Sequence, residues 1–264
     1  MKKLISFLVV FLFSFSPSCY CQVSKEEILK KITEKYASIK NLSGEIEINM
    51  SVMGNIMKIP AKFWKSGKKF RMEMKMEQPG MPQPMEQIMI FDGTTMWQYQ
   101  KTINVVTVID FSKMPDKIKK EFEKCQSFTG MDERMYKIIS QTAEDISLTE
   151  KERNGKKFYV LEIKNLTDIS KQLPFQSQQK MQFFKKILIW VNPDYYIKKI
   201  EMYGEAKEPG MWIEFKNLRE EEINPSLFKF KVPEGAKVMD MTEMMIEMMK
   251  KMEEMSEGLE KEGK

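Results

Sequence analysis

The stretch that decides the fold is "IMKIPAKFWKSGKKFRMEMKM", residues 56–76. In its second half Phe70, Met72 and Met74 alternate with charged residues. A period of two is typical of a strand with one apolar and one wet face. Ser66-Gly67 separates this run from the apolar run before it and supplies a turn. The stretch therefore predicts two antiparallel strands joined by a hairpin.

The same pattern extends in both directions from this hairpin. Upstream, "EIEINMSVMG" (45–54) places Ile48 and Met50 on one side of a strand. Downstream, Asp92-Gly93 and Asn154-Gly155 are hairpin signals, and Asn192-Pro193-Asp194 predicts a turn. Further strands are expected at "MEQIMIF", "TMWQYQ", "INVVTVID", a strand near 145, "KKFYVLEIK", "FKKILIWV", "YIKKIEMYG" and "MWIEFKNL". Short connections between about eleven strands predict one strongly curved antiparallel sheet.

Helical patterns occur at three places. Ser24 and Glu27 form a capping box, and the apolar spacing behind them predicts a helix to about Asn41. Residues 111–125 and 131–142 read as two short helices, whereas 168–182 is polar and predicts a loop. The fold class expected is α+β, with one strongly curved antiparallel sheet and about three helices.

The N-terminus predicts export. Lys2 and Lys3 precede an apolar run, Leu4–Phe15, that is short for a membrane span. We expect residues 1–21 to be a cleaved signal peptide, 22–238 to be the folded domain and 239–264 to be a separate tail. Lipid attachment to Cys19 is the less favoured alternative, because the residues before it fit a lipidation signal poorly.

Composition excludes several functions. The chain has no histidine, which removes the commonest general base, and it contains no nucleotide-binding or serine-hydrolase motif. Loss of the two signal lysines leaves 41 Lys and Arg against 38 Asp and Glu, so no binding to nucleic acid is expected. Cys125 is the one cysteine left, and it has no disulfide partner in the chain. We expect neither an enzyme nor a cofactor.

Four segments in a fixed order resemble the LolA-like family of periplasmic lipoprotein carriers. They are "FWKSGKKFRMEM" (63–74), "IFDGTTMWQY" (90–99), "IWVNPDYYIKKIEMYG" (189–204) and "EFKNLREEEINPSLFKFKVPEGAKV" (214–238). Each segment is a turn signal with alternation around it, and their order carries the resemblance, which runs from about Lys25 to Val238.

The resemblance implies a half-open β-barrel with helices over its concave face. The cavity between the sheet and these helices takes up lipoprotein acyl chains or another lipid in the periplasm. It also implies an inner-membrane donor protein and an outer-membrane acceptor protein as partners. One departure concerns the arginine that latches the lid in the family: Ser66 stands at the matching position, with Lys65 and Lys68 as weaker substitutes. Arg71 is expected on the wet face of its strand.

Methionine and aromatic side chains dominate the alternating positions. Such side chains suit a surface that accepts variable apolar shapes, although the same pattern also fits an ordinary core. The expected lining of the lipid cavity is Ile48, Met50, Phe63, Phe70, Met72, Met74, Met89, Trp97, Tyr99 and Trp190.

The tail repeats methionine at three- and four-residue spacing, which predicts an amphipathic helix. Met244, Met245, Met248 and Met252 are its candidate lid residues, and packing on the body of the protein is the alternative. Thioethers also bind Cu(I), so a copper-binding protein is one alternative function. The other is a periplasmic sensor that binds a lipid or a partner protein. We predict no metal site, because the methionines follow strand and helix periods.

Overall fold

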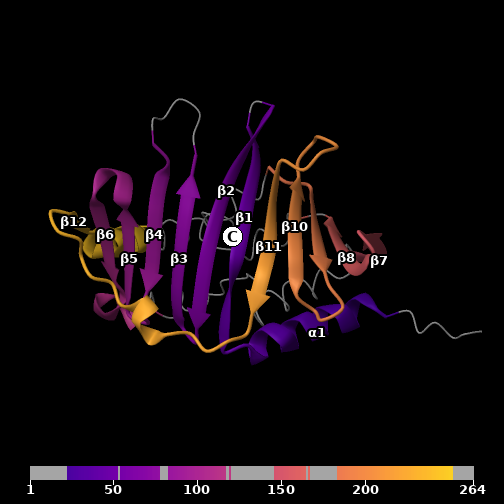
Figure 1. Ribbon diagram of the computed structural model, residues 1–264, viewed down its shortest axis with the longest axis horizontal. Helices are drawn as coiled ribbons and strands as arrows, with labels where there is room; N and C mark the ends of the chain where they lie inside the picture. The colour runs from indigo at the N-terminus through magenta and orange to yellow at the C-terminus, as the bar shows by residue number, and fades with distance from the viewer. Residues whose placement is uncertain are drawn as a thin grey trace, which may run out of the picture.

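The computed structural model describes residues 23–52, 54–77, 83–116, 119, 146–164, 166 and 183–251. A twelve-stranded sheet dominates this part of the chain, with helix α1 (Lys25–Ser38) before it and a helix at 242–251 after it (Figure 1). The expected helices at 111–125 and 131–142, the loop at 168–182 and the signal peptide lie largely or wholly outside the described residues.

The strands follow the predicted hairpins closely. Their bounds are β1 Asn41–Val52, β2 Asn55–Ser66, β3 Lys69–Met76, β4 Met85–Phe91, β5 Thr95–Gln100, β6 Val105–Asp110, β7 Ile146–Arg153, β8 Lys156–Lys164, β9 Lys186–Val191, β10 Ile197–Tyr203, β11 Met211–Arg219 and β12 Lys237–Asp240. The 3₁₀ turns are η1 Lys101–Ile103, η2 Phe111–Lys113 and η4 Pro225–Phe228. The expected curved, mostly antiparallel sheet is confirmed.

Strand order runs β12-β6-β5-β4-β3-β2-β1-β11-β10-β9-β8-β7, so β1 lies in the middle and the chain leaves it in both directions. Every neighbouring pair is antiparallel except β12 with β6, which is parallel. Sequence reasoning misses β12, because the methionine repeat places Met239 and Asp240 in the tail. The helix begins only at Thr242, whose hydroxyl accepts a hydrogen bond from the Asp110 backbone.

Helix α1 lies across one end of the strands and fills the larger core. Its predicted N-cap is confirmed: the Ser24 hydroxyl accepts from the Glu27 N–H at 3.1 Å. Ile28, Leu29 and Ile32 are almost fully buried against side chains of one sheet face. The helix ends at Ser38, three residues earlier than predicted, because β1 already begins at Asn41.

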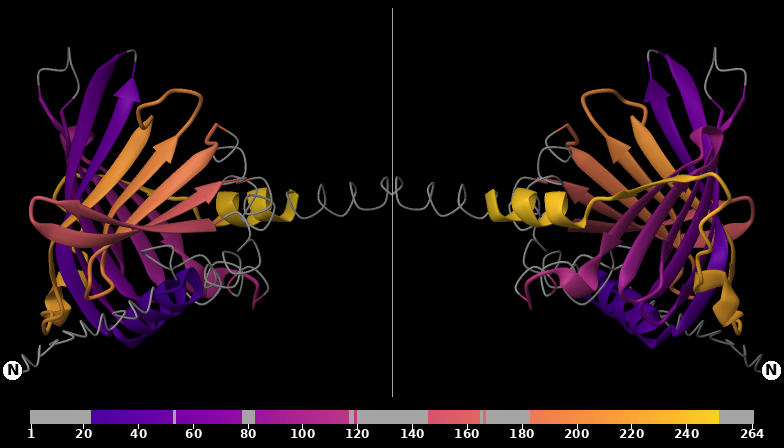
Figure 2. Two further views of the ribbon diagram at one scale, coloured as in Figure 1. Left: turned by 90° about the vertical axis from the view of Figure 1, so that its right-hand side faces the viewer. Right: turned by 90° about the vertical axis from the view of Figure 1, so that its left-hand side faces the viewer.

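The sheet bends around the side that carries the tail helix, and we call that side the concave face (Figure 2). On the opposite, convex face runs the segment 220–236, called the strap, which contains η4. Phe228 in the strap is 2% exposed, and the Arg71 guanidinium donates to the Leu227 carbonyl at 3.0 Å. Arg71 therefore points to the expected face, but the strap covers it.

Candidate functional site

Methionine side chains gather on the concave face, as the pairing of the strands shows. Residues directly opposite each other in a ladder share a face. Met57, Met50, Met211 and Met202 are successive partners across β2, β1, β11 and β10. Met72 of β3 is paired with Met89 of β4 in the same way. The methionine face, as defined here, comprises Met50, Met57, Met72, Met74, Met89, Met202 and Met211, all of which lie on the sheet.

The two halves of the concave face differ in composition. On β7 to β9 the ladders are mostly aliphatic, with Tyr159 among them, and Ile163, Leu161 and Ile189 are almost fully buried in the core with α1. Toward β5 the face carries methionine and phenylalanine beside Gln87 and Gln98. A surface of this second kind adapts to different apolar shapes, because methionine is unbranched and polarizable.

Seven of the ten predicted lining residues share the concave face. They are Ile48, Met50, Phe63, Phe70, Met72, Met74 and Met89. Within this group Phe63 is 0% exposed and belongs to the core, so it supports the face without being open to a ligand.

The prediction that Trp97 and Tyr99 line the cavity is wrong. Trp97 is paired with Ile90, and Ile90 with Arg71, which places the indole on the convex face. There Phe230 of the strap stacks on Trp97 with ring centroids 5.2 Å apart and also touches Tyr99. The alternation of β5 is ambiguous because both of its faces carry apolar side chains, one under the strap and one inside.

Trp190 is also on the convex face, contrary to the prediction. Its partner across the ladder is Lys199, and its indole N–H donates to Glu201 at 2.8 Å. Glu201 is only 7% exposed, and its carboxylate also accepts from the Lys199 ammonium at 2.7 Å. Burial raises the pKa of Glu201, but the hydrogen bonds from Lys199 and Trp190 outweigh this effect and lower the pKa overall.

The candidate lid residues divide between two sides of the tail helix. Met245 packs with Ile246 and Met249 against Phe91 and Phe111 on the concave face. Met244 and Met248 point outward, with 61% and 38% of their surface exposed. Met252 lies outside the described residues. The helix thus covers the β4–β6 end of the concave face through one narrow apolar stripe.

Sequence reasoning misses several concave-face residues, namely Met57, Phe91, Met96, Met202 and Met211. Their signal is present, because each alternates with polar or outward residues in its own strand. What the sequence does not reveal is the register that sets Met57 beside Met50 and Met211 beside Met202.

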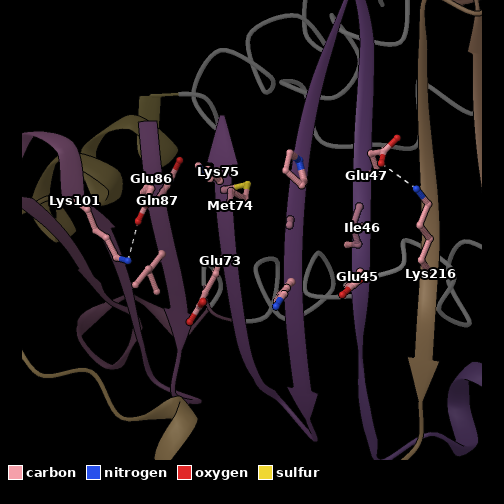
Figure 3. A pocket seen from close by; sticks show the side chains of 14 residues that line it. Glu45, Ile46, Glu47, Glu73, Met74, Lys75, Glu86, Gln87, Lys101 and Lys216 are labelled. Atoms are coloured by element: carbon pink, nitrogen blue, oxygen red, sulfur yellow. Dashed lines mark hydrogen bonds and ion pairs between the residues drawn. The ribbon is translucent and has the colours of Figure 1, made fainter. Parts of the chain in front are cut away.

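A separate groove of about 490 Å³ crosses the middle of the sheet (Figure 3). Most of its side chains belong to the convex face, and its ion pairs join Lys101 to Glu86 and Lys216 to Glu47, each at 2.9 Å. Its charged lining consists of Glu45, Glu47, Lys62, Glu73, Lys75, Glu86, Lys101 and Lys216. Cross-strand ion pairs of this kind suit a solvated surface, and the groove is poorly suited to an acyl chain.

Metal-binding clusters of Cys, Asp or Glu and membrane-spanning helices are both absent from the described residues. No group of three or more Cys, Asp or Glu side chains there is arranged to hold a metal ion. No helix in the described ranges is long and apolar enough to cross a membrane.

Comparison with known proteins places the fold. No family model matches the chain. An uncharacterised protein from Methanocaldococcus jannaschii is 29% identical over 241 residues, which cover 90% of this chain and 60% of that protein. The chain therefore spans less than two thirds of the length of this relative.

Two solved structures illustrate the likeness of fold. An uncharacterised conserved protein from Thermus thermophilus has a TM-score of 0.50 at 12% identity, over 81% of this chain and 98% of that one. A LolA superfamily protein from Nitrosomonas europaea has a TM-score of 0.32 at 13% identity, over 79% and 98%. The likeness to the Thermus thermophilus structure shows a shared fold, and a protein of the LolA superfamily is among the solved structures to which the chain is similar.

Proposed function

We propose that this protein is an exported lipid-binding protein that holds acyl chains on its concave face. In this proposal it shields the acyl chains of lipoproteins, or of another lipid, from water during transfer or sorting. It acts by binding and not by catalysis. The LolA-like fold supports the class, and the chemistry of the concave face supports the ligand.

The observation that carries the proposal is the methionine face. Four of its thioether side chains lie side by side on four neighbouring strands, and the other three lie on the same face of β3 and β4, beside Ala61 and Phe63 of β2. Removing each CH₂ group of an acyl chain from water contributes about 0.8 kcal/mol, and this face offers such groups an apolar surface that can adapt to them. The charged convex groove offers nothing comparable.

The tail helix contributes to the same surface. Through Met245 and Met249 it closes the β4–β6 end of the concave face, where the body of the protein supplies Phe91 and Met96. We infer that the helix acts as one wall of the acyl site. This role gives the tail methionines the function of an adaptable cover.

Native mass spectrometry of the purified protein, followed by organic extraction, tests the proposal. A co-purifying lipid or acylated peptide is expected, and it should be lost from Met72→Glu and Met74→Glu, which place a charge on the concave face. Ile56→Glu is the matched control, because Ile56 is 56% exposed on the convex side of β2. An empty protein that also fails to bind a fluorescent fatty acid would refute the proposal.

A second candidate function is Cu(I) binding, favoured by the row Met57, Met50, Met211 and Met202. Thioether sulfur is a ligand of Cu(I), and four such side chains are successive ladder partners here. Titration with Cu(I) in the presence of a competing chelator tests this function. The pair Met50→Leu with Met211→Leu should abolish binding, while Met244→Leu on the outer side of the tail helix should leave it unchanged.

A further inference from the structure

The concave face of strands β1 to β6 carries a single charged side chain, Lys65. Every Asp, Glu, Arg and other Lys side chain on these six strands alternates onto the convex face or its edge. The concave row that contains the lysine reads, from strand to strand, Leu42, Lys65, Phe70, Phe91, Met96 and Ile109.

The surroundings of Lys65 are apolar. Its two ladder partners are Leu42, which is 1% exposed, and Phe70, which packs against the main core. Burial lowers the pKa of Lys65, and no neighbouring carboxylate opposes this effect. Within the described ranges the ammonium forms no ion pair and no hydrogen bond. By contrast, Lys199 on the convex face is paired with Glu201 at 2.7 Å.

A half-buried cation without a counter-ion is unfavourable, because burial removes water that the protein does not replace. An anionic group brought by a ligand would stabilise the ammonium and be stabilised by it. Met72 is the diagonal neighbour of Lys65 across the β2–β3 ladder, and Met89 is the next residue in that row. An acyl chain whose anionic end lies at Lys65 can therefore lie directly along methionine side chains.

We propose that Lys65 binds the anionic head group of an amphiphile whose acyl chain lies on the methionine face. This inference rests on the proposed function and narrows its ligand class to long-chain lipids with a carboxylate or phosphate next to the acyl chain. A neutral acyl chain would still bind the methionine face but would gain nothing from Lys65.

Competition experiments on the purified protein test this assignment. A fluorescent fatty acid is displaced by oleate, by oleyl alcohol, which has the same chain without the charge, and by dioleoyl phosphatidic acid. The variants are Lys65→Met, which keeps an apolar stem of similar length, Lys65→Arg, which keeps the charge, and Lys62→Met. Lys62 is the matched control, because it is exposed on the convex face of the same strand.

The wild-type protein should bind oleate at least about tenfold more tightly than oleyl alcohol, which corresponds to roughly 1.4 kcal/mol. Lys65→Met should remove this preference while leaving oleyl alcohol unaffected, and Lys65→Arg and Lys62→Met should retain it. A stronger effect of Lys65→Met on phosphatidic acid than on oleate assigns a phosphate head group, and the reverse a carboxylate.

Equal binding of oleate and oleyl alcohol by the wild-type protein, or an unchanged preference in Lys65→Met, would overturn the role of Lys65 alone. Failure of both oleate and oleyl alcohol to bind would instead remove the proposed acyl site, and the inference with it. The two failures are thus distinguishable by the neutral probe.

Discussion

Phe63 shows how much a single side chain contributes to this sheet. It lies at 0% exposure on the concave side of β2, beside Gly44 of β1. A Cβ on Gly44 would stand only 3.0 Å from the Phe63 ring, so the aromatic ring occupies the space that the glycine leaves. The close approach joins β1, β2 and the core under α1 into one packed unit.

Phe63→Ala should destabilise the protein by about 3 to 5 kcal/mol, because it opens a cavity that rigid strands on both sides cannot close. Urea unfolding followed by circular dichroism measures the change. Lys62→Ala, one residue away and exposed, should alter the free energy of unfolding by less than about 0.5 kcal/mol. Similar losses for the two variants would argue against a rigid core at Phe63.

Glu201 gives a residue-scale prediction with a pH dependence. Its pKa is lowered in the folded protein, so its stabilising contribution is present above the unfolded carboxyl range and is lost as pH falls through the folded pKa. Glu201→Gln should cost about 1 to 3 kcal/mol at pH 7, because Lys199 loses the nearer of its two carboxylate partners and keeps only Glu214 at 3.7 Å.

The difference between Glu201→Gln and the wild type should shrink as the pH falls below the ordinary carboxyl range and through the lowered pKa of Glu201, where the wild-type carboxylate becomes protonated. Unfolding by urea at pH 7 and about pH 3, monitored by tryptophan fluorescence, checks this expectation. A difference that stays constant across this range would show that the ion pair with Lys199 does not stabilise the fold.

At the scale of elements, the described residues hold the tail helix to the sheet through a hydrogen bond at Thr242 and one apolar stripe. Thr242 accepts a hydrogen bond from the Asp110 N–H at 2.9 Å, and Ile246 is the buried residue at the centre of its apolar stripe. An element with one narrow stripe opens at a lower free energy than the sheet beneath it. Among the described elements, the helix is therefore the part of the concave wall most easily displaced.

Ile246→Asp should release the tail helix while leaving the sheet folded, because a charge cannot be buried against Phe91 and Phe111. Hydrogen exchange should show lost protection at 242–251 and retained protection in β1 and β2. Met244→Asp serves as the control, since Met244 is 61% exposed and should leave the exchange pattern unchanged. Loss of protection in β1 as well would contradict an independently opening helix.

The positions of the strands are largely predictable from the sequence, whereas the face of the sheet on which a side chain lies is not. The turn signals at Asn154-Gly155 and Asp92-Gly93 place the hairpins because their backbone requirements are local; Asn154 and Gly155 both have positive φ, and the Asp92 carboxylate accepts from the Thr94 and Thr95 N–H groups. Trp97 cannot be placed in this way, because β5 carries apolar residues on both sides. Only the strap, more than a hundred residues later, decides which side is the interior.

The chemical character of the candidate site is predictable from the sequence, but the full set of residues that form it is not. Methionine alternation along the strands suffices to identify Met72, Met74 and Met89. The row from Met57 to Met202 depends on the register between β2, β1, β11 and β10. Registers between strands distant in sequence are fixed by packing of the whole sheet, which local patterns do not contain. The apolar neighbours of Lys65 cannot be predicted from the sequence for the same reason, because they are set by the pairing of β2 with β1 and β3.

At the scale of the whole molecule, the C-terminal part holds the sheet on both sides. The strap covers Ile90 and Trp97 on the convex face, β12 extends the sheet at β6, and the tail helix covers Phe91 on the concave face. The segment after β11 thus encloses the β4–β6 edge from one face to the other.

Two truncations test this arrangement. Removal of 242–264 should expose apolar surface on one face only, whereas removal of 220–264 should expose both faces of β4–β6 and open an unprotected edge strand. Binding of anilinonaphthalene sulfonate should rise modestly in the first variant and strongly in the second, with aggregation visible by light scattering in the second alone. Equal responses would mean that the strap contributes nothing beyond the tail helix.

The position of the strap in the chain sets the order in which the protein can be completed. All strands from β1 to β11 precede it, so Trp97 and its neighbours stay uncovered until the strap has been synthesised. A chain interrupted before this point keeps a wet apolar surface and an open sheet edge. The sheet therefore reaches its covered state only after the strap and the tail helix have been synthesised, and until then it most needs protection from other chains.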